Sequence, residues 1–317
     1  MKKYFYLFIL PVSIAMVSCD KVENAYPPGL SSQGGLNWDL YPDGDSAVYV
    51  SNGLWPSFSQ NTNTDRNVLI EDFTGHKCIF CPAAATEATN IKDANPGRVY
   101  VAGIHTSPFG VGNFQEIDPP IYEHDFTCVE GLAIGQYFGD DWPGSLFQGN
   151  PFGAVSRMDP NTSEPVTSPT NWASITTQIL SANELKVNIQ ADVNYFSSTR
   201  GVFLHTELEK IDNTLNNELR VVVYLIQDTI QKPQLFPSPI NDSLEYVHHH
   251  VMRGTVDGFA LGQILDATHS PNNDEKYYFN YSYELPTQYD PSNMQLLIYV
   301  RDAVTEEIYH VIKKDIE

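Results

Sequence analysis

The residues best suited to chemistry are two cysteines three positions apart, Cys78 and Cys81, in the run His76-Lys77-Cys78-Ile79-Phe80-Cys81-Pro82. The thiolate is the reactive form of cysteine, and a helix N-terminus or nearby positive charge stabilises it. A second thiol one turn away can resolve a mixed disulfide formed by the first. The spacing therefore predicts a redox pair with Cys78 as nucleophile and Cys81 as resolving thiol. A permanent disulfide and a metal half-site are the alternatives.

A strand, a helix and a second strand must position this pair. The β-rich run 68–73 precedes the cysteines, and a second strand is expected at 98–105. Between them, Ala84, Ala88 and Ile91 fall at i, i+4 and i+7, which places them on one face of a helix. A strand-to-helix turn inside a βαβ pattern favours a redox pair, because a zinc site would need a second Cys or His pair.

This arrangement resembles the thioredoxin superfamily, and the resemblance implies two further site residues. Asp72, six residues before Cys78, matches the buried acid that exchanges a proton with the resolving cysteine, with Glu71 as the alternative if the register slips. Pro151 matches the family's cis-proline, whose backbone would contact a substrate chain opposite the cysteines. Cis X–Pro bonds are infrequent, so this expectation rests on the resemblance.

Several features depart from that superfamily. Lys77 stands where a Trp usually precedes the first cysteine, and Ile79-Phe80 replaces the usual dipeptide between them. An insertion of loop character is expected at 106–127, before a helix at 130–138. A closing helix is expected to carry its apolar residues on one face (Trp172, Ile175, Ile179). The departures leave oxidant and reductant equally open.

Two residues near this pattern have open roles. His105 ends the second strand, and the carboxyl ends of parallel strands share one edge of a sheet, so it is expected near Cys78. It is either functional or a polar loop residue. Cys128 is the remaining thiol of this region, either a buried small hydrophobe or a third redox partner.

From Leu185 onward the pattern changes to strict alternation of apolar and polar residues. Seven short strands are expected, at 185–193, 202–208, 219–227, 246–252, 276–285, 294–301 and 307–312. Short alternating strands with turn-rich gaps are typical of a β-sandwich. Pro233, Pro237 and Pro239 mark one long loop, and Asp302, Glu306 and Glu307 are expected in a solvated turn.

Three consecutive histidines, His248, His249 and His250, fall within one of these expected strands. Alternation would place His248 and His250 on one face and His249 on the other. Two imidazoles could bind Zn²⁺ or Cu²⁺, but no third ligand is identifiable, so polar strand residues or a domain contact is the plainer interpretation.

The N-terminus has the pattern of a secretory signal. Lys2 and Lys3 precede an apolar run from Tyr4 to Val17, which is short for a membrane-spanning helix. Ser18-Cys19 resembles a bacterial lipobox, which would make Cys19 the lipid-bearing first residue of the mature protein. The expected organisation is a signal peptide (1–18), a tether (19–65) with a short strand at 47–51, a thioredoxin-like domain (66–182) and a sandwich (183–317).

The composition excludes one class of partner. The chain of 317 residues has 18 Lys and Arg against 39 Asp and Glu, a formal net charge of −21. Nucleic acids and anionic lipid surfaces require clustered basic residues, so neither is an expected partner.

The whole pattern resembles the outer-membrane-protein-28 lipoprotein family. The resemblance rests on the lipobox, on Phe73-Thr74-Gly75 with Cys78-x-x-Cys81-Pro82, and on the strand around His248-His249-His250. It implies an α/β thioredoxin-like domain followed by an all-β immunoglobulin-like sandwich, located at the outer membrane.

Three functions are compatible with this pattern. The first is thiol–disulfide exchange with the thiols or disulfides of envelope proteins, without a cofactor. The second is a non-catalytic binding or assembly lipoprotein in which Cys78–Cys81 is a structural disulfide. The third is copper handling through Cys78, Cys81 and a histidine.

Overall fold

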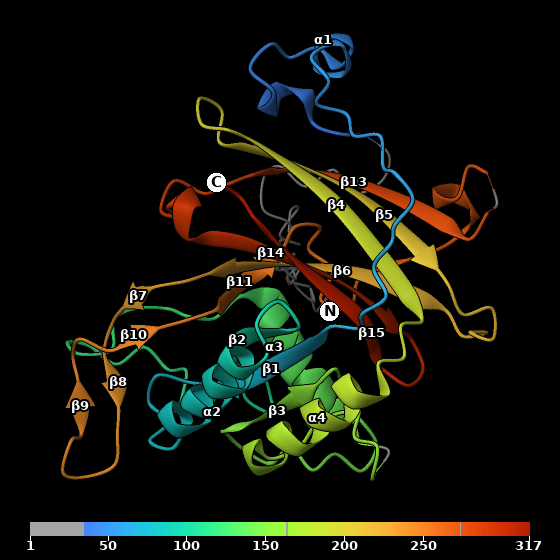
Figure 1. Cartoon of the computed structure of the whole chain (residues 1–317). Coiled ribbons are helices and arrows are strands. Elements are labelled where there is room, and N and C mark those ends of the chain that lie inside the picture. The colour runs from blue at the N-terminus through green and yellow to red at the C-terminus, as the bar shows by residue number, and fades with distance from the viewer. Residues whose placement is uncertain (1–34, 163, 273) are drawn as a thin grey trace, which may run out of the picture.

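The computed structural model describes residues 35–162, 164–272 and 274–317, so the expected signal peptide and Cys19 lie outside the described residues. The fold is mixed α/β, with several β-sheets and few helices (Figure 1). Its longer helices are α2 (Cys81–Ala94), α3 (Val129–Gln136) and α4 (Trp172–Ala182). Within the described ranges, no helix is long and apolar enough to cross a membrane.

The largest sheet has the strand order β15-β14-β6-β11-β2-β1-β3, with β12 also paired to β6. These strands are β1 (Val68–Thr74), β2 (Val99–His105), β3 (Phe152–Val155), β6 (Leu219–Gln227), β11 (Val251–Thr255), β12 (Gln263–Ile264), β14 (Met294–Asp302) and β15 (Ile308–Asp315). β1 and β2 are parallel, whereas β3 is antiparallel to β1. The strands expected on both sides of the cysteines are therefore confirmed.

This sheet crosses the boundary expected between the two domains. β11 lies parallel to β2, with Val251 opposite Gly103. The Gly103 N–H donates to the His250 carbonyl at 2.7 Å. The strand that follows the three histidines therefore joins the βαβ unit to the sandwich strands through backbone hydrogen bonds.

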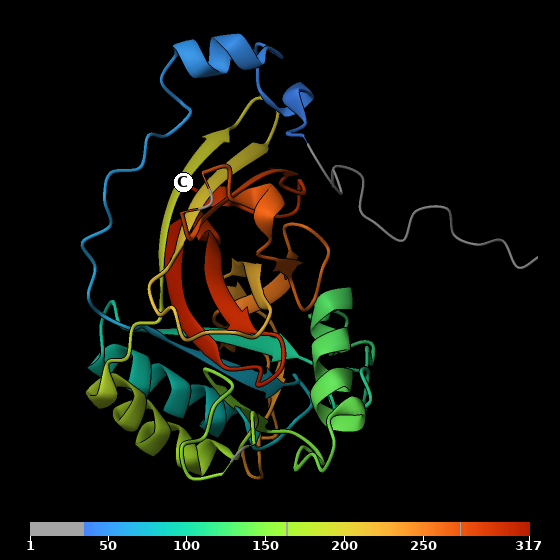
Figure 2. The same cartoon turned by 90° about the vertical axis from the view of Figure 1, so that its right-hand side faces the viewer.

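Helices cover both faces of β1 and β2. Figure 2 shows α2 and α4 on one side of these strands and α3 on the other. Val68 and Ile70 face α2 and α4, whereas Leu69 and Phe73 belong to the core beneath α3. The expected apolar helix faces are buried in the first of these cores (Ala84, Ala88, Ile91, Trp172, Ile175, Ile179). Because side chains alternate along a strand, Asp72 lies on the α2 face and Glu71 on the α3 face.

A three-stranded antiparallel sheet packs against the sandwich end of the large sheet. It consists of β4 (Val187–Phe196), β5 (Gly201–Lys210) and β13 (Lys276–Glu284) in the order β13-β5-β4. The expected alternation is confirmed, because the inward residues of β4 and β5 share one core with those of β6 and β14 (Val187, Ile189, Val202, Leu204, Leu208, Val221, Val223, Leu296, Ile298).

The segment before β1 packs on the sandwich. The strand expected at 47–51 is wrong, because these residues form the short helix α1 (Ser46–Ser51). The Asp45 carboxylate caps this helix by accepting from the Ala47 N–H at 2.7 Å. Tyr49 of α1 is fully buried against Phe203 on the outer face of β5, at 5.2 Å between ring centroids. Side-chain capping and this aromatic contact outweigh the β-preference of Val48 and Val50.

The loop expected around Pro233–Pro239 is a two-part β-structure, here called the arm (residues 230–248). β7 (Ile230–Gln231) pairs with β10 (Val247–His248), and β8 (Gln234–Leu235) pairs with β9 (Asp242–Ser243). Figure 1 shows the arm, in orange, extending away from the sandwich on the side of α2.

Candidate functional site

Cys78 and Cys81 form a disulfide in a tight turn between β1 and α2, with 5.4 Å between their Cα atoms. The Cys78 N–H donates to the Gly75 carbonyl at 3.0 Å, and the Cys81 N–H donates to the Cys78 carbonyl at 3.2 Å. The helix begins at Cys81, with Pro82 in its first turn, where proline is favoured. Cys78 therefore lies in the turn before the helix rather than at its first position.

Both sulfur-bearing side chains are sealed from solvent, since Cys78 and Cys81 are each 1% exposed. The arm covers them. Its Gln234 Nε2 donates to the Cys78 carbonyl at 3.1 Å, and its Leu235 N–H donates to the His76 carbonyl at 2.8 Å. The sequence carries no motif for this cover, because Gln234 lies 156 residues from Cys78 along the chain.

The insertion at 106–127 fastens both the turn and the arm. The Tyr122 ring stacks on His76 at 5.3 Å between centroids, and its hydroxyl donates to Asp242 Oδ1 on the arm at 2.5 Å. Lys77 forms an ion pair with Asp118 of the insertion at 2.9 Å. Lys77 and the insertion thus act together in enclosing the cysteine turn.

Asp72 is a buried carboxyl group on the α2 face of β1. Asp72 is 3% exposed, and its Oδ1 atom has no hydrogen-bond partner. Loss of hydration on burial raises the pKa of Asp72 to about 8. The carboxyl group can therefore take up or release a proton near neutral pH, on the same side of the sheet as Cys81.

Glu71, the alternative acid, has a different environment. Its carboxylate receives two hydrogen bonds from the Arg157 guanidinium, at 2.7 and 2.8 Å, and a third from the Tyr224 hydroxyl at 2.7 Å. It is fully buried on the α3 face. These contacts hold Glu71 in a structural ion pair. Of the two acids, Asp72 is therefore the one on the cysteine side of the sheet with an unpartnered oxygen.

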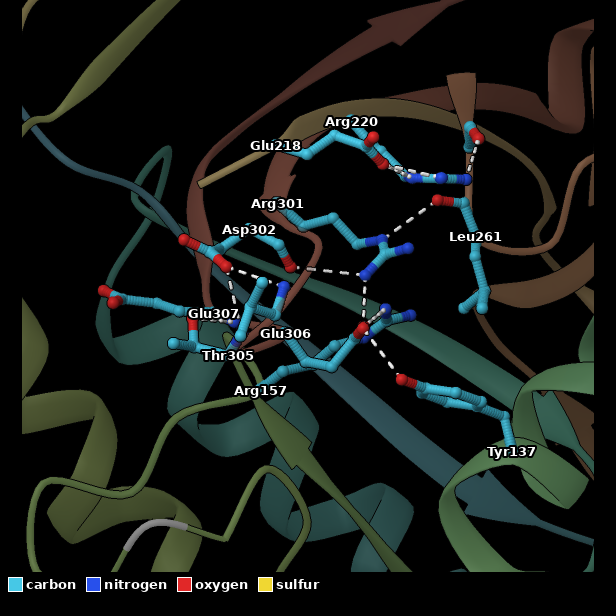
Figure 3. Close-up of polar contacts among 12 residues, drawn as sticks. Tyr137, Arg157, Glu218, Arg220, Leu261, Arg301, Asp302, Thr305, Glu306 and Glu307 are labelled. Atoms are coloured by element: carbon cyan, nitrogen blue, oxygen red, sulfur yellow. Dashed lines mark hydrogen bonds and ion pairs between the residues drawn. The ribbon is translucent and has the colours of Figure 1, made fainter. Parts of the chain in front are cut away.

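The ion pair of Glu71 belongs to a larger buried network. Arg157 also donates to Glu306 at 3.2 Å, and Glu306 is bound in turn by Arg301 and by the Tyr137 hydroxyl, as Figure 3 shows. These residues come from β1, the helical turn that follows α3, the segment after β3, β14 and the β14–β15 turn. They therefore connect the βαβ unit to the sandwich.

The expectation of a solvated turn at 302–307 is wrong for two of its acids. Glu306 is fully buried and Asp302 is 2% exposed. Asp302 accepts hydrogen bonds from Asn217 at 2.9 Å and from the Tyr309 hydroxyl at 2.8 Å. Glu307 pairs with Arg66 at 2.9 Å. Acidic residues in a turn are normally hydrated, but here each of the two buried acids has a partner that is distant in sequence, Arg157 for Glu306 and Asn217 for Asp302.

The Asn150–Pro151 peptide bond is cis, as expected. β3 follows it and pairs with β1 so that Phe152 lies opposite Phe73. Pro151 consequently lies at the end of the sheet where β1 leads into the cysteine turn. The Asn150 side chain donates to the Thr106 carbonyl at 2.8 Å, which joins this loop to the insertion.

Four histidines surround the Phe126 ring beneath the arm. Their ring centroids lie between 4.3 and 5.5 Å from that of Phe126 (His76, His105, His124, His248). Each has one buried ring nitrogen without a hydrogen-bond partner, and loss of hydration is the largest cause that lowers each pKa. The pKa of His124 and that of His248 fall to about 4. His105 does lie in the cysteine region, lining a small cavity together with Cys81.

The strand geometry expected for the three consecutive histidines is wrong. His250 has the left-handed φ of 56°, which interrupts the chain between β10 and β11 and breaks the alternation. His249 and His250 both approach Asp228, at 2.7 and 3.4 Å, while His248 turns toward Phe126. Among the described residues no group of three His, Cys, Asp or Glu can hold a metal ion.

Cys128 is the N-cap residue of α3, away from the cysteine turn. Its Sγ approaches the Met252 carbonyl at 3.8 Å, and burial raises the pKa of its thiol to about 12. A thiol that stays protonated is a poor nucleophile, which favours the small-hydrophobe interpretation over a redox partner.

A larger hollow of about 320 Å³ lies between Trp55–Phe58 and the outer face of β5 and β13. Its two titratable residues on β5, His205 and Glu207, already have hydrogen-bond partners. His205 is bonded to Tyr49 and Asn280, and Glu207 to Gln190, Lys276 and Tyr278. The cysteine turn is therefore the better candidate site, because Asp72 and the imidazoles beneath the arm retain unpartnered atoms.

Comparisons with known proteins bear on family and fold. The model of the family "Outer membrane protein Omp28" matches residues 146–317, more than half of the chain. HBP35 of Porphyromonas gingivalis is similar in fold, with a TM-score of 0.58 at 14% identity over 80% of this chain and 76% of that one. A domain of the outer membrane lipoprotein Omp28 from Porphyromonas gingivalis matches 42% of this chain and 88% of that one, with 22% identity and a TM-score of 0.28.

No curated protein matches the chain. The residues that match the family model include the sandwich strands, the arm and the β14–β15 turn. The protein thus belongs to the Omp28 outer membrane protein family, whose place is the cell envelope.

Proposed function

We propose that this protein is a lipid-anchored, non-catalytic binding or assembly component of the outer membrane, in which Cys78–Cys81 is a closed disulfide. The observation that carries the proposal is the 1% exposure of each cysteine beneath the arm. Thiol–disulfide exchange requires a thiolate to approach a sulfur directly, and in this conformation neither sulfur can be approached.

The domain organisation is part of the proposal. The parallel β1–α2–β2 unit with antiparallel β3, cis Pro151 and α4 supports a thioredoxin-like domain at 66–182. The two packed sheets that follow support an immunoglobulin-like sandwich at 183–317. Cys19 would carry the lipid. A Cys19→Ser variant should then leave the membrane fraction of the cell, whereas retention there would contradict the anchor.

The test of the closed disulfide is redox titration of the full chain with an insulin-reduction assay at pH 7.5. We expect a reduction potential below about −300 mV and no turnover of insulin. Thioredoxin provides the positive control, and a Cys78→Ser variant provides the background. Turnover well above that background would contradict the proposal.

Thiol–disulfide exchange on envelope proteins is the second candidate, and Asp72 is the observation that favours it. In the reductive direction, the Cys78 thiolate would attack a partner's disulfide, forming a mixed disulfide and releasing one partner thiolate. Asp72 would accept the Cys81 proton, and the Cys81 thiolate would then attack Cys78 Sγ. The partner would leave as a dithiol and the Cys78–Cys81 pair would be oxidised. Pro151 would contact the partner's backbone.

The small size of the disulfide ring also keeps this candidate open. The bridge joins residues only three positions apart. In the chain-entropy account, so short a loop stabilises the fold by about 2 kcal/mol, the low end for disulfides. Exchange would predict that Asp72→Asn slows insulin turnover and removes a transition near pH 8 from its pH profile, an effect that a purely structural Asp72 would not produce.

A further inference from the structure

We propose that the arm is a strap that must lift before the Cys78–Cys81 disulfide can react, and that the histidines beneath it set the pH at which it lifts. The inference rests on the closed conformation described above and holds whether or not the pair is catalytic.

The strap is attached to the cysteine turn through backbone acceptors. Leu235 donates its N–H to the His76 carbonyl at 2.8 Å, and Gln234 donates to the carbonyls of Cys78 and Gly75 at 3.1 and 3.4 Å. The arm thus adds an extended segment to the turn in the way that a bound peptide would. Gln234 itself is 3% exposed, so its hydrogen bonds to these carbonyls are shielded from water in the closed arm.

The arm is built to move separately from the two cores. Its paired strands contain two residues each, and the larger apolar side chains near its tip are exposed, Ile240 at 61% and Leu244 at 57%. Elements with short ladders and little apolar burial open at lower free energy than a domain core. Besides the cysteine turn, the arm contacts the insertion through the hydrogen bond from Tyr122 to Asp242 and through the packing of Ile230 and His248 against Phe126.

The histidines come from four segments that meet beneath the strap. They belong to the cysteine turn (His76), the end of β2 (His105), the insertion (His124) and the arm itself (His248). His248, Gln234 and Cys81 line one small cavity of about 30 Å³. Protonating these rings would place charge between the strap and the disulfide that it covers.

The charged groups around the imidazoles disfavour their protonation in the closed state. The four rings repel one another when charged. Facing cations add to this effect, and Asp125 opposes it (Lys77, Lys232, Arg253). The Glu116 and Lys232–Pro233 backbone carbonyls also favour the charged forms of His76 and His248, but loss of hydration is the larger effect.

The sign of the pH effect follows from burial. Closed, His124 and His248 have a pKa of about 4, whereas a hydrated histidine has a pKa of about 6.5. The closed strap is therefore favoured above pH 6.5 and loses stability as the pH falls from about 6.5 toward 4. Each histidine that becomes hydrated on opening shifts the equilibrium toward the open strap by up to about tenfold per pH unit in that range.

The experiment measures the rate at which a water-soluble phosphine reduces the disulfide in the full chain. The phosphine attacks one sulfur, the S–S bond breaks, water supplies the oxygen of the phosphine oxide, and two thiols form. Rates are divided by those of an oxidised peptide of residues 74–85 at the same pH, which cancels the reductant's own pH dependence. Mass spectrometry follows the product.

The strap contact is tested at pH 7.5. Gln234→Ala should speed reduction by about tenfold, because it removes the hydrogen bonds to the cysteine turn. Gln231→Ala is the matched control, since Gln231 lies on the same arm but its side chain bonds to Glu245, within the arm. Equal rates for the Gln234→Ala variant and the wild type would overturn the proposal that the arm must lift before the disulfide reacts.

The pH response is tested between pH 7.5 and pH 5.5. We expect the normalised wild-type rate to rise more than tenfold, and His248→Gln to reduce that rise by up to about tenfold. His124→Gln is the second variant in case the first does not fold. His249→Gln is the control, because the His249 side chain is 52% exposed. A flat wild-type profile, or an equal loss in the control, would overturn the role of the histidines.

Hydrogen exchange separates strap opening from global unfolding. The Leu235 amide should lose protection in acid while the β6 and β14 amides keep theirs. Parallel loss in all three would mean that reduction follows unfolding, which would overturn the strap. Insulin turnover is read separately, so failure of the strap and failure of the proposed function remain distinguishable.

Discussion

Two buried polar clusters in this protein differ in whether their polar groups have hydrogen-bond partners. In the network around Arg157, Glu71 is bound by the Arg157 guanidinium group and by the Tyr224 hydroxyl. Glu306 is bound by the guanidinium groups of Arg157 and Arg301 and by the Tyr137 hydroxyl (Figure 3). Beneath the arm, Asp72 and the four imidazoles each retain an unpartnered polar atom. The first cluster joins the two regions through ion pairs, whereas the second contains polar groups that lack such partners.

The contrast is sharpest between two adjacent residues. Glu71 and Asp72 follow one another in β1 and point to opposite faces of the same sheet. Glu71 is paired with Arg157, and Asp72 faces the cysteine side without a counter-charge. The position of a carboxylate in the strand, which sets the face of the sheet that it points to, decides whether it finds an arginine partner or is buried without one.

Arg157→Met should produce the largest effect, because it breaks the paired cluster. The variant would leave Glu71 and Glu306 buried without their common partner, at a cost of about 5 kcal/mol in the free energy of unfolding. Urea denaturation at pH 7 measures it. Arg220→Ala is the control, since Arg220 pairs with Glu218 near the surface and should cost less than about 1 kcal/mol. Similar losses in both variants would contradict the distinction.

Asp72→Asn should have the opposite sign to any change in the paired cluster. The folded pKa of Asp72 is raised to about 8, so the carboxyl group stays protonated in the fold while the unfolded chain ionises above about pH 4. Wild-type stability is therefore lost as the pH rises from about 4 to 8. The amide escapes this loss and should stabilise the protein by roughly 4 kcal/mol at pH 7.

The neighbouring carboxylate provides the control for that variant. Glu71→Gln weakens the pair with Arg157 and should destabilise the fold, so the two substitutions one residue apart move the free energy of unfolding in opposite directions. Urea denaturation at pH 5 and pH 8 measures both. A stabilisation by Asp72→Asn that does not grow between these pH values would contradict the titration of Asp72.

Local patterns in the sequence predict much of this fold. Period-two alternation identifies the sandwich strands, and the i, i+4, i+7 spacing of Ala84, Ala88 and Ile91 identifies α2. Both patterns report which face of an element is buried, which is a property of neighbouring residues. The resemblance to a known family supplies Asp72 and cis Pro151 in the same way, from residues close to the cysteines.

Long-range polar contacts are beyond such patterns. From the sequence Glu306 is predicted to be a solvated acid, because one of its partners, Arg157, is 149 residues away. Gln234 is predicted to be a loop residue, because its partner Cys78 is 156 residues away. No period in the sequence relates such pairs, and yet they decide that the turn at 302–307 is buried and that the disulfide is sealed.

Removing the disulfide should have the smallest effect of the three. Replacing both Cys78 and Cys81 by Ser releases a ring of three-residue separation and should lower the free energy of unfolding by about 2 kcal/mol. Cys128→Ser is the control for thiol removal. A loss as large as that of Arg157→Met would mean that the disulfide, rather than the ion network, holds the two regions together. A loss near 2 kcal/mol would mean that the covalent bond contributes less to the stability of the fold than the buried ion pairs of Arg157 do.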